Sequence, residues 1–162
     1  MNDSALLLRQ FDRRLIDGLY VEAMVLADEA RSYLDTRAEE HRGMLDKLGR
    51  VEFACESLKV TTRLMHVIAW LLTQRAVFHG ELPPSVRDDP RYQLGDAAPT
   101  SGEAIERFSE EMIDLVNGSE ELYDRVARLE AQILRSGRGW RDAPAMLPSP
   151  ARDLLNRLES AF

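Results

Sequence analysis

Residues 55–77, CESLKVTTRLMHVIAWLLTQRAV, decide the fold because they predict a helix that is apolar over most of its surface. One line of small and apolar side chains follows the alternating three- and four-residue spacing of a helix–helix seam: Cys55, Leu58, Thr62, Met65, Ala69, Leu72 and Ala76. A second apolar line lies beside it: Ala54, Thr61, Leu64, Ile68 and Leu71. The third line is mainly polar: Glu56, Lys59, Arg63, His66 and Thr73, with Trp70 among them. A surface helix usually shows one apolar stripe, so two helices of the chain or another subunit must cover this one.

The second apolar line therefore predicts a homodimer. We assign Leu64, Ile68 and Leu71 to the interface between the two copies and leave the first line for the core of each copy. A homodimer is expected to use the same patch on both subunits.

Length and composition indicate a single globular domain. A chain of 162 residues can bury a core without disulfides or metal, and 44% apolar with 30% charged residues is typical of a folded protein. The net charge of −7 disfavours nucleic acid as the main partner, because phosphate binding needs a basic face.

The chain shows no sign of export or membrane insertion. Its single cysteine suits a reducing compartment, and the first residues, MNDSALLLRQF, lack the basic start of a secretory signal. The longest nearly apolar run, residues 64–72, is far shorter than the roughly 18 residues that a membrane span requires. We expect a cytoplasmic protein with no membrane partner.

Three long helical patterns and no alternating strand pattern predict an all-α fold. The first pattern lies within residues 4–37, the second ends at Phe78 after a start at Met44 or Val51, and the third runs from Thr100 to about residue 135. Thr100 and Glu103 match a capping box at the start of the third. We predict an antiparallel up-down-up three-helix bundle over residues 1–135, with the last two helices each about 45 Å long.

Two segments fall outside these helices. Residues 80–100 contain four prolines, and an irregular loop of this length is either mobile or functional. Glycines and prolines in residues 136–162 predict a flexible tail that does not extend the third helix. The tail ends in four apolar residues that share one side of a short amphipathic segment: Leu154, Leu155, Leu158 and Phe162. They could bind a partner or fold back onto the bundle.

No residue pattern predicts catalysis or a metal or cofactor site. His41, His66 and His79 lack the spacing of a zinc motif. Cys55 is interpreted as a buried structural residue, because a reactive cysteine needs an exposed, electropositive setting. We therefore predict a non-enzymatic protein that binds no cofactor.

The run from Glu56 to Met65, ESLKVTTRLM, continues through residues 69–77, AWLLTQRAV, to Gly80 and Glu81. It resembles the signature of the alphaproteobacterial RcdA-like family, named for the regulator of CtrA degradation and also described as a domain of unknown function. Residues 22–24, 28–30 and 33–35 add weaker support. The resemblance implies a three-helix bundle that can dimerise and has no enzymatic activity. It also implies an adaptor in cell-cycle proteolysis, which helps bring substrates to the ClpXP protease together with a response-regulator-type protein.

Three other functions remain open at the level of sequence. The first is a structural or scaffolding dimer with no link to a protease. The second is a helical regulator that binds a small molecule in a pocket around Trp70. A helix-turn-helix DNA-binding protein is the least favoured, given the acidic charge and the absence of a short recognition helix.

Overall fold

The structure is a computed structural model that describes the backbone of residues 3–141 and the side chains of residues 12–136. Residues 1–130 form one compact unit, and residues 131–162 form a second. The described part of the chain contains helices and no strand, which confirms the all-α class. Its α-helices are α1 (Asp3–Thr36), α2 (Ala38–Gly43), α3 (Lys47–Phe78), α4 (Gly102–Ile105) and α5 (Glu110–Arg141). The 3-10 helices η1 (Pro84–Asp88) and η2 (Pro90–Tyr92) lie between α3 and α4.

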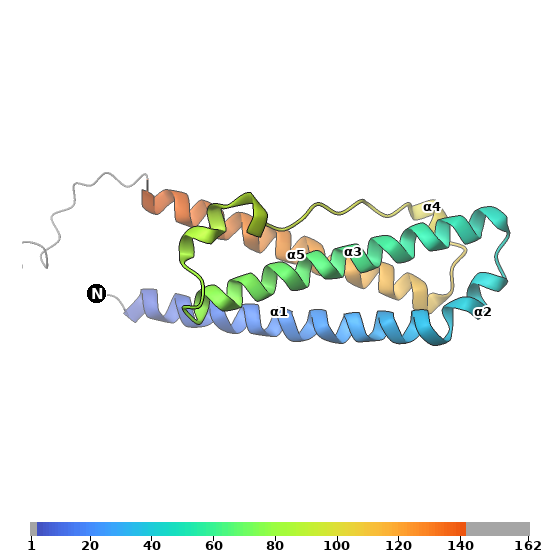
Figure 1. The fold of residues 1–162 in the computed structure, drawn as a ribbon, viewed down its shortest axis with the longest axis horizontal. Coiled ribbons are helices and arrows are strands. Elements are labelled where there is room, and N and C mark those ends of the chain that lie inside the picture. The colour runs from blue at the N-terminus through green and yellow to red at the C-terminus, as the bar shows by residue number, and fades with distance from the viewer. Residues whose placement is uncertain (1–2, 142–162) are drawn as a thin grey trace, which may run out of the picture. The chain divides into compact units, whose positions relative to one another are not determined.

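The direction of α5 differs from the predicted up-down-up arrangement. Near the start of α3, Phe53 packs edge-on against Phe108, with ring centroids 5.4 Å apart. Further along, Arg63 of α3 donates to Ser119 of α5 at 3.3 Å. Residue numbers rise together on the two helices, so α3 and α5 run parallel while α1 runs opposite to both (Figure 1).

The segment between α3 and α5 explains this topology. Figure 1 shows it returning along the length of the helices, from the end of α3 to the end where α3 begins. A turn between neighbouring antiparallel helices needs only a few residues, whereas parallel neighbours need a long crossover connection. The proline-rich loop of residues 80–100 is part of this crossover.

The core is built from one face of each long helix. α1 contributes Ile16, Leu19, Ala23 and Ala30; α3 contributes Val60, Leu64, Val67 and Leu71; α5 contributes Met112, Leu115, Val116, Leu122 and Val126. Each of these side chains is buried. Fully burying one such apolar side chain contributes about 1.5–3 kcal/mol, so this shared core is the main source of stability for residues 1–130.

Local chemistry fixes the ends of α3. The Asp46 carboxylate accepts a hydrogen bond of 2.7 Å from the Gly49 amide, which satisfies one of the free donors at the helix start. After the helix ends, Gly80 has a φ of 76°, a conformation that favours glycine.

The third predicted helix departs from expectation at both ends. The chain forms the short α4 and then a separate α5, instead of one helix from Thr100. The predicted capping box is replaced, because the Thr100 amide donates to Glu120 and its hydroxyl accepts from Arg63. At the other end α5 continues to Arg141, past the predicted limit of residue 135. Glycine weakens a helix without breaking it, and the first proline comes only at Pro144.

Candidate interaction surfaces

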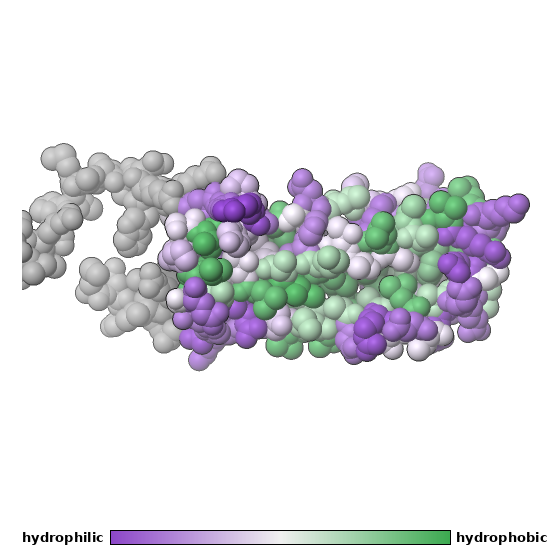
Figure 2. All heavy atoms as spheres, viewed as in Figure 1, coloured by the Kyte–Doolittle hydropathy of each residue, from purple (hydrophilic) through white to green (hydrophobic). Residues whose placement is uncertain are grey.

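A row of large apolar side chains lies exposed along α3. We call Leu48, Val51, Leu58, Met65 and Leu72 the exposed α3 face; their exposed fractions are 61%, 61%, 67%, 63% and 46%. At 1.5 Å per residue the row spans about 36 Å. Figure 2 shows apolar residues gathered along the middle of the side on which α3 lies. A continuous apolar row with heptad spacing is typical of a helix–helix interface.

The three residues of the second line that we assigned to the dimer interface lie on the core side of α3 instead. Leu64 and Leu71 are buried in the chain's own core, and Ile68 is half-buried. The first line, expected in the core, is the one that faces out. Cys55 belongs to that line and is exposed, which corrects its interpretation as a buried cysteine.

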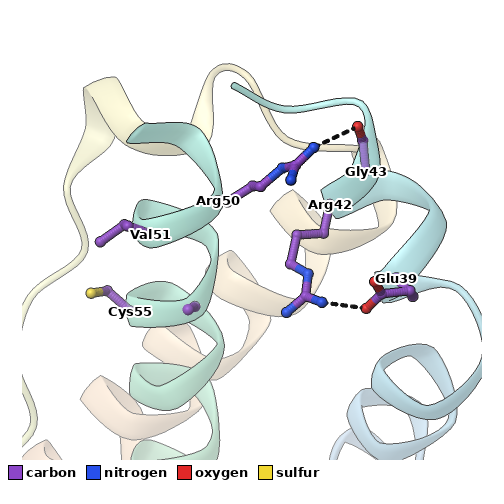
Figure 3. A pocket seen from close by; sticks show the side chains of 7 residues that line it. Glu39, Arg42, Gly43, Arg50, Val51 and Cys55 are labelled. Atoms are coloured by element: carbon purple, nitrogen blue, oxygen red, sulfur yellow. Dashed lines mark hydrogen bonds and ion pairs between the residues drawn. The ribbon is translucent and has the colours of Figure 1, made fainter. Parts of the chain in front are cut away.

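A hollow of about 340 Å³ adjoins one end of the exposed α3 face (Figure 3). Val51, Ala54 and Cys55 of α3 form its apolar wall. Arg42 and Arg50 also line it, but both guanidinium groups are engaged, Arg42 with Glu39 and Arg50 with the carbonyls of Leu45 and Gly43. The hollow therefore extends the apolar surface of α3.

A second, smaller apolar area lies on α1. Val21, Met24 and Val25 are 62%, 44% and 53% exposed. Val25 also lines a hollow of about 310 Å³ between α1 and α5, together with Glu22, Leu26, Glu29, Gly118, Glu121 and Leu122. Its rim is acidic. Trp70, in contrast, is 3% exposed and lines neither of these two hollows.

The polar line of α3 faces a segment of the crossover that we call the strap, residues 94–101. Arg63 is only 2% exposed, yet it donates to the Ala98 carbonyl at 2.9 Å and to the Thr100 hydroxyl at 2.8 Å. It also donates to Glu120 at 3.2 Å. These acceptors offset the cost of burying a guanidinium group, which is large when the charge has no partner.

Other side chains of α3 and α5 bind the strap in the same way. Lys59 donates to the Pro99 carbonyl at 2.8 Å, and the Tyr123 hydroxyl donates to the Gly95 carbonyl at 2.7 Å. Burial and the nearby Asp96 charge raise the pKa of the Tyr123 phenol, which favours its protonated, donating form. Carboxylates accept from three of the strap amides: Glu130 from Leu94 at 2.7 Å, Glu120 from Thr100 at 2.9 Å and Glu56 from Ser101 at 3.3 Å.

The remaining residues singled out in the sequence lie apart. His41 contacts the Tyr33 hydroxyl and His79 contacts Arg13, while His66 packs under the strap at Gly95. In the described part of the chain, no three His, Cys, Asp or Glu side chains are grouped to hold a metal ion. Leu154, Leu155, Leu158 and Phe162 of the tail lie outside the described residues.

Comparison with known proteins gives the family. Residues 8–162 match the family described as a protein of unknown function, DUF1465. The chain belongs to this family. Among solved structures, it is similar to RcdA from Caulobacter crescentus CB15, with 33% sequence identity and a TM-score of 0.61 over 74% of this chain and 90% of that one. This match confirms the RcdA-like resemblance seen in the α3 sequence. No curated protein sequence shows a significant match to the chain.

Membership of the RcdA-like family suggests a related role as a regulator. In addition, none of the helices in the described part of the chain is long and apolar enough to cross a membrane.

Proposed function

We propose that the chain is a non-enzymatic, cytoplasmic adaptor in cell-cycle-linked proteolysis. It helps deliver substrate proteins to the ClpXP protease, together with a response-regulator-type partner. The observation that carries the proposal is the similarity to RcdA over 90% of that chain at 33% identity. The interaction surfaces of the RcdA-like chain are consistent with a protein that acts by binding other proteins.

We also propose that the adaptor is a homodimer through the exposed α3 face. The supporting observation is the row from Leu48 to Leu72, whose heptad spacing suits packing against a second copy of the same helix. Each copy would cover the apolar side chains of the other, and the hollow beside Val51 and Cys55 would receive side chains from the partner. The acidic hollow between α1 and α5 would stay accessible to other proteins.

A reconstituted degradation assay tests the adaptor role. Purified ClpXP is mixed with the response-regulator-type partner and candidate substrates captured from the native cytoplasm, with and without this chain. The proposal predicts at least one substrate that is degraded faster when the chain is added. Capture of no ClpX and no acceleration of any captured substrate would contradict it.

The tail is the proposed partner-binding segment, through Leu154, Leu155, Leu158 and Phe162. Truncation after Arg138 should abolish partner capture and leave the melting temperature unchanged. A truncated chain that melts several degrees lower and still captures every partner would assign the tail to the fold instead.

The alternative function is a structural or scaffolding dimer. The exposed α3 face favours it as much as it favours the adaptor, because a scaffold needs the same interface. The degradation assay separates the two, since a scaffold leaves the rate of substrate degradation unchanged.

A further inference from the structure

The strap is held almost entirely through its backbone. Six side chains of α3 and α5 bind it, and we call them the polar track: Glu56, Lys59, Arg63, Glu120, Tyr123 and Glu130. They contact the amides of Leu94, Thr100 and Ser101 and the carbonyls of Gly95, Ala98 and Pro99. Every peptide carries these groups, so such contacts recognise an extended conformation more than a particular sequence.

The strap side chains add one hydrogen bond to this binding, which the Thr100 hydroxyl accepts from Arg63 at 2.8 Å. None of residues 94–101 is buried, and Asp96, Ala98 and Pro99 are exposed. One position does select for size: a Cβ atom on Gly95 would lie 2.7 Å from the His66 ring. The polar track would therefore accept other extended segments that place a glycine against His66.

Two buried polar atoms beside the strap have hydrogen-bonding capacity that the strap does not use. Glu56 is 2% exposed, and its Oε2 atom has no hydrogen-bond partner among the described residues; the same holds for the buried Nδ1 atom of His66. Without the strap, Arg63 would lose its hydrogen bonds to the Ala98 carbonyl and the Thr100 hydroxyl and would keep those to Ser119 and Glu120. A segment that replaces the strap must therefore supply acceptors for the two hydrogen bonds that Arg63 loses.

We propose that the polar track is a binding site for extended peptide segments, occupied by the strap until a segment of a partner protein with glycine against His66 replaces it. The strap then acts as a built-in competitor. It is covalently attached, so its effective concentration at the track is on the order of millimolar. Only a segment that adds further contacts elsewhere, or one present at high local concentration, displaces it. The proposal does not depend on the adaptor role.

The test uses the full chain and a fluorescently labelled peptide with the strap sequence, QLGDAAPTSG, residues 93–102. Gly95→Leu should clash with His66 and release the strap, which hydrogen exchange at the Leu94 and Thr100 amides reports directly. Fluorescence anisotropy should then show the peptide binding the variant at least about tenfold more tightly than the wild type, because the built-in competitor has gone. Gly102→Leu is the matched control, since a Cβ there meets nothing within 4 Å. This control should bind the peptide no better than the wild type.

Four results would overturn the proposal. The first is a folded Gly95→Leu variant whose strap amides exchange rapidly but which does not bind the peptide. The second is a variant whose strap amides stay protected, which would remove the size selection at His66. The third is that the peptide binds the Gly95→Leu variant equally well after Arg63→Met is added. The fourth is that a peptide with leucine in place of the glycine binds the Gly95→Leu variant as tightly as the original peptide does. If Gly95→Leu does not fold, Gly95→Ala makes the same comparison with a smaller side chain.

Discussion

Replacing Arg63 by methionine tests how far the buried polar network stabilises the fold. Methionine keeps much of the aliphatic volume and removes the four hydrogen bonds that Arg63 makes to Ser119, Ala98, Thr100 and Glu120. A hydrogen bond to a charged group is worth about 1.5–3 kcal/mol, and breaking a fully buried ion pair costs about 3–5 kcal/mol. Glu120 is 37% exposed and Ala98 is also exposed, so water replaces part of what is lost. We expect a loss of about 2–4 kcal/mol in the free energy of unfolding.

Arg75→Met is the matched control because it makes the same substitution on the same helix. Arg75 pairs with Asp17 and lies over the Tyr20 ring, but its side chain is 32% exposed and that of Asp17 is 43% exposed. An exposed pair of this kind should cost about 1 kcal/mol. Urea denaturation at one fixed protein concentration measures both variants, since self-association makes stability depend on concentration. Equal losses for the two variants would refute the reasoning.

Two further predictions concern a helix end and pH. Asp46→Ala removes the acceptor for the Gly49 amide and should lower the free energy of unfolding, measured by urea denaturation, by about 1 kcal/mol. The helix content measured by circular dichroism should not change. A loss of stability below the error of the measurement would contradict the stabilising role of the Asp46 cap. The folded structure raises the pKa of Tyr123 above its ordinary value of 10.0, chiefly through burial, so it favours the protonated phenol. This contribution to stability is complete below about pH 10 and is lost as pH rises through the folded-state pKa. The stability difference between wild type and Tyr123→Phe should therefore be constant from neutral pH to about pH 9 and change only above about pH 10. Titration of the phenol, measured by ultraviolet absorbance, should follow the same curve. A stability difference that already varies around pH 8 would contradict this prediction.

The sequence predicts the long helices well because their apolar spacing is regular. The observed α3, Lys47–Phe78, lies close to the pattern predicted for it, and α1 ends within one residue of its predicted limit at residue 37. These helices bury side chains at the spacing on which the prediction rests.

The sequence does not predict which side of α3 faces the core. Charged residues are rarely buried unless they are paired, and the partners of Arg63 lie in the strap and α5, far away in the sequence. The burial of Arg63 and Glu56 turns Leu64 and Leu71 inward and leaves Leu58 and Met65 exposed. The sequence does not predict the direction of α5 either, because loop length alone does not distinguish a mobile loop from a crossover.

The mass of the protein in solution tests the central claim most directly, namely that a second copy covers the exposed α3 face. Light scattering at high micromolar concentration should give twice the chain mass of 18.4 kDa. Leu58→Glu combined with Met65→Glu should give a folded monomer, because these two side chains are 67% and 63% exposed in the single chain. Val21→Glu combined with Val25→Glu on α1 makes a matched change at exposed positions and should leave the dimer intact. A wild-type protein that stays monomeric, or a dimer that survives the α3 substitutions unchanged, would contradict the account.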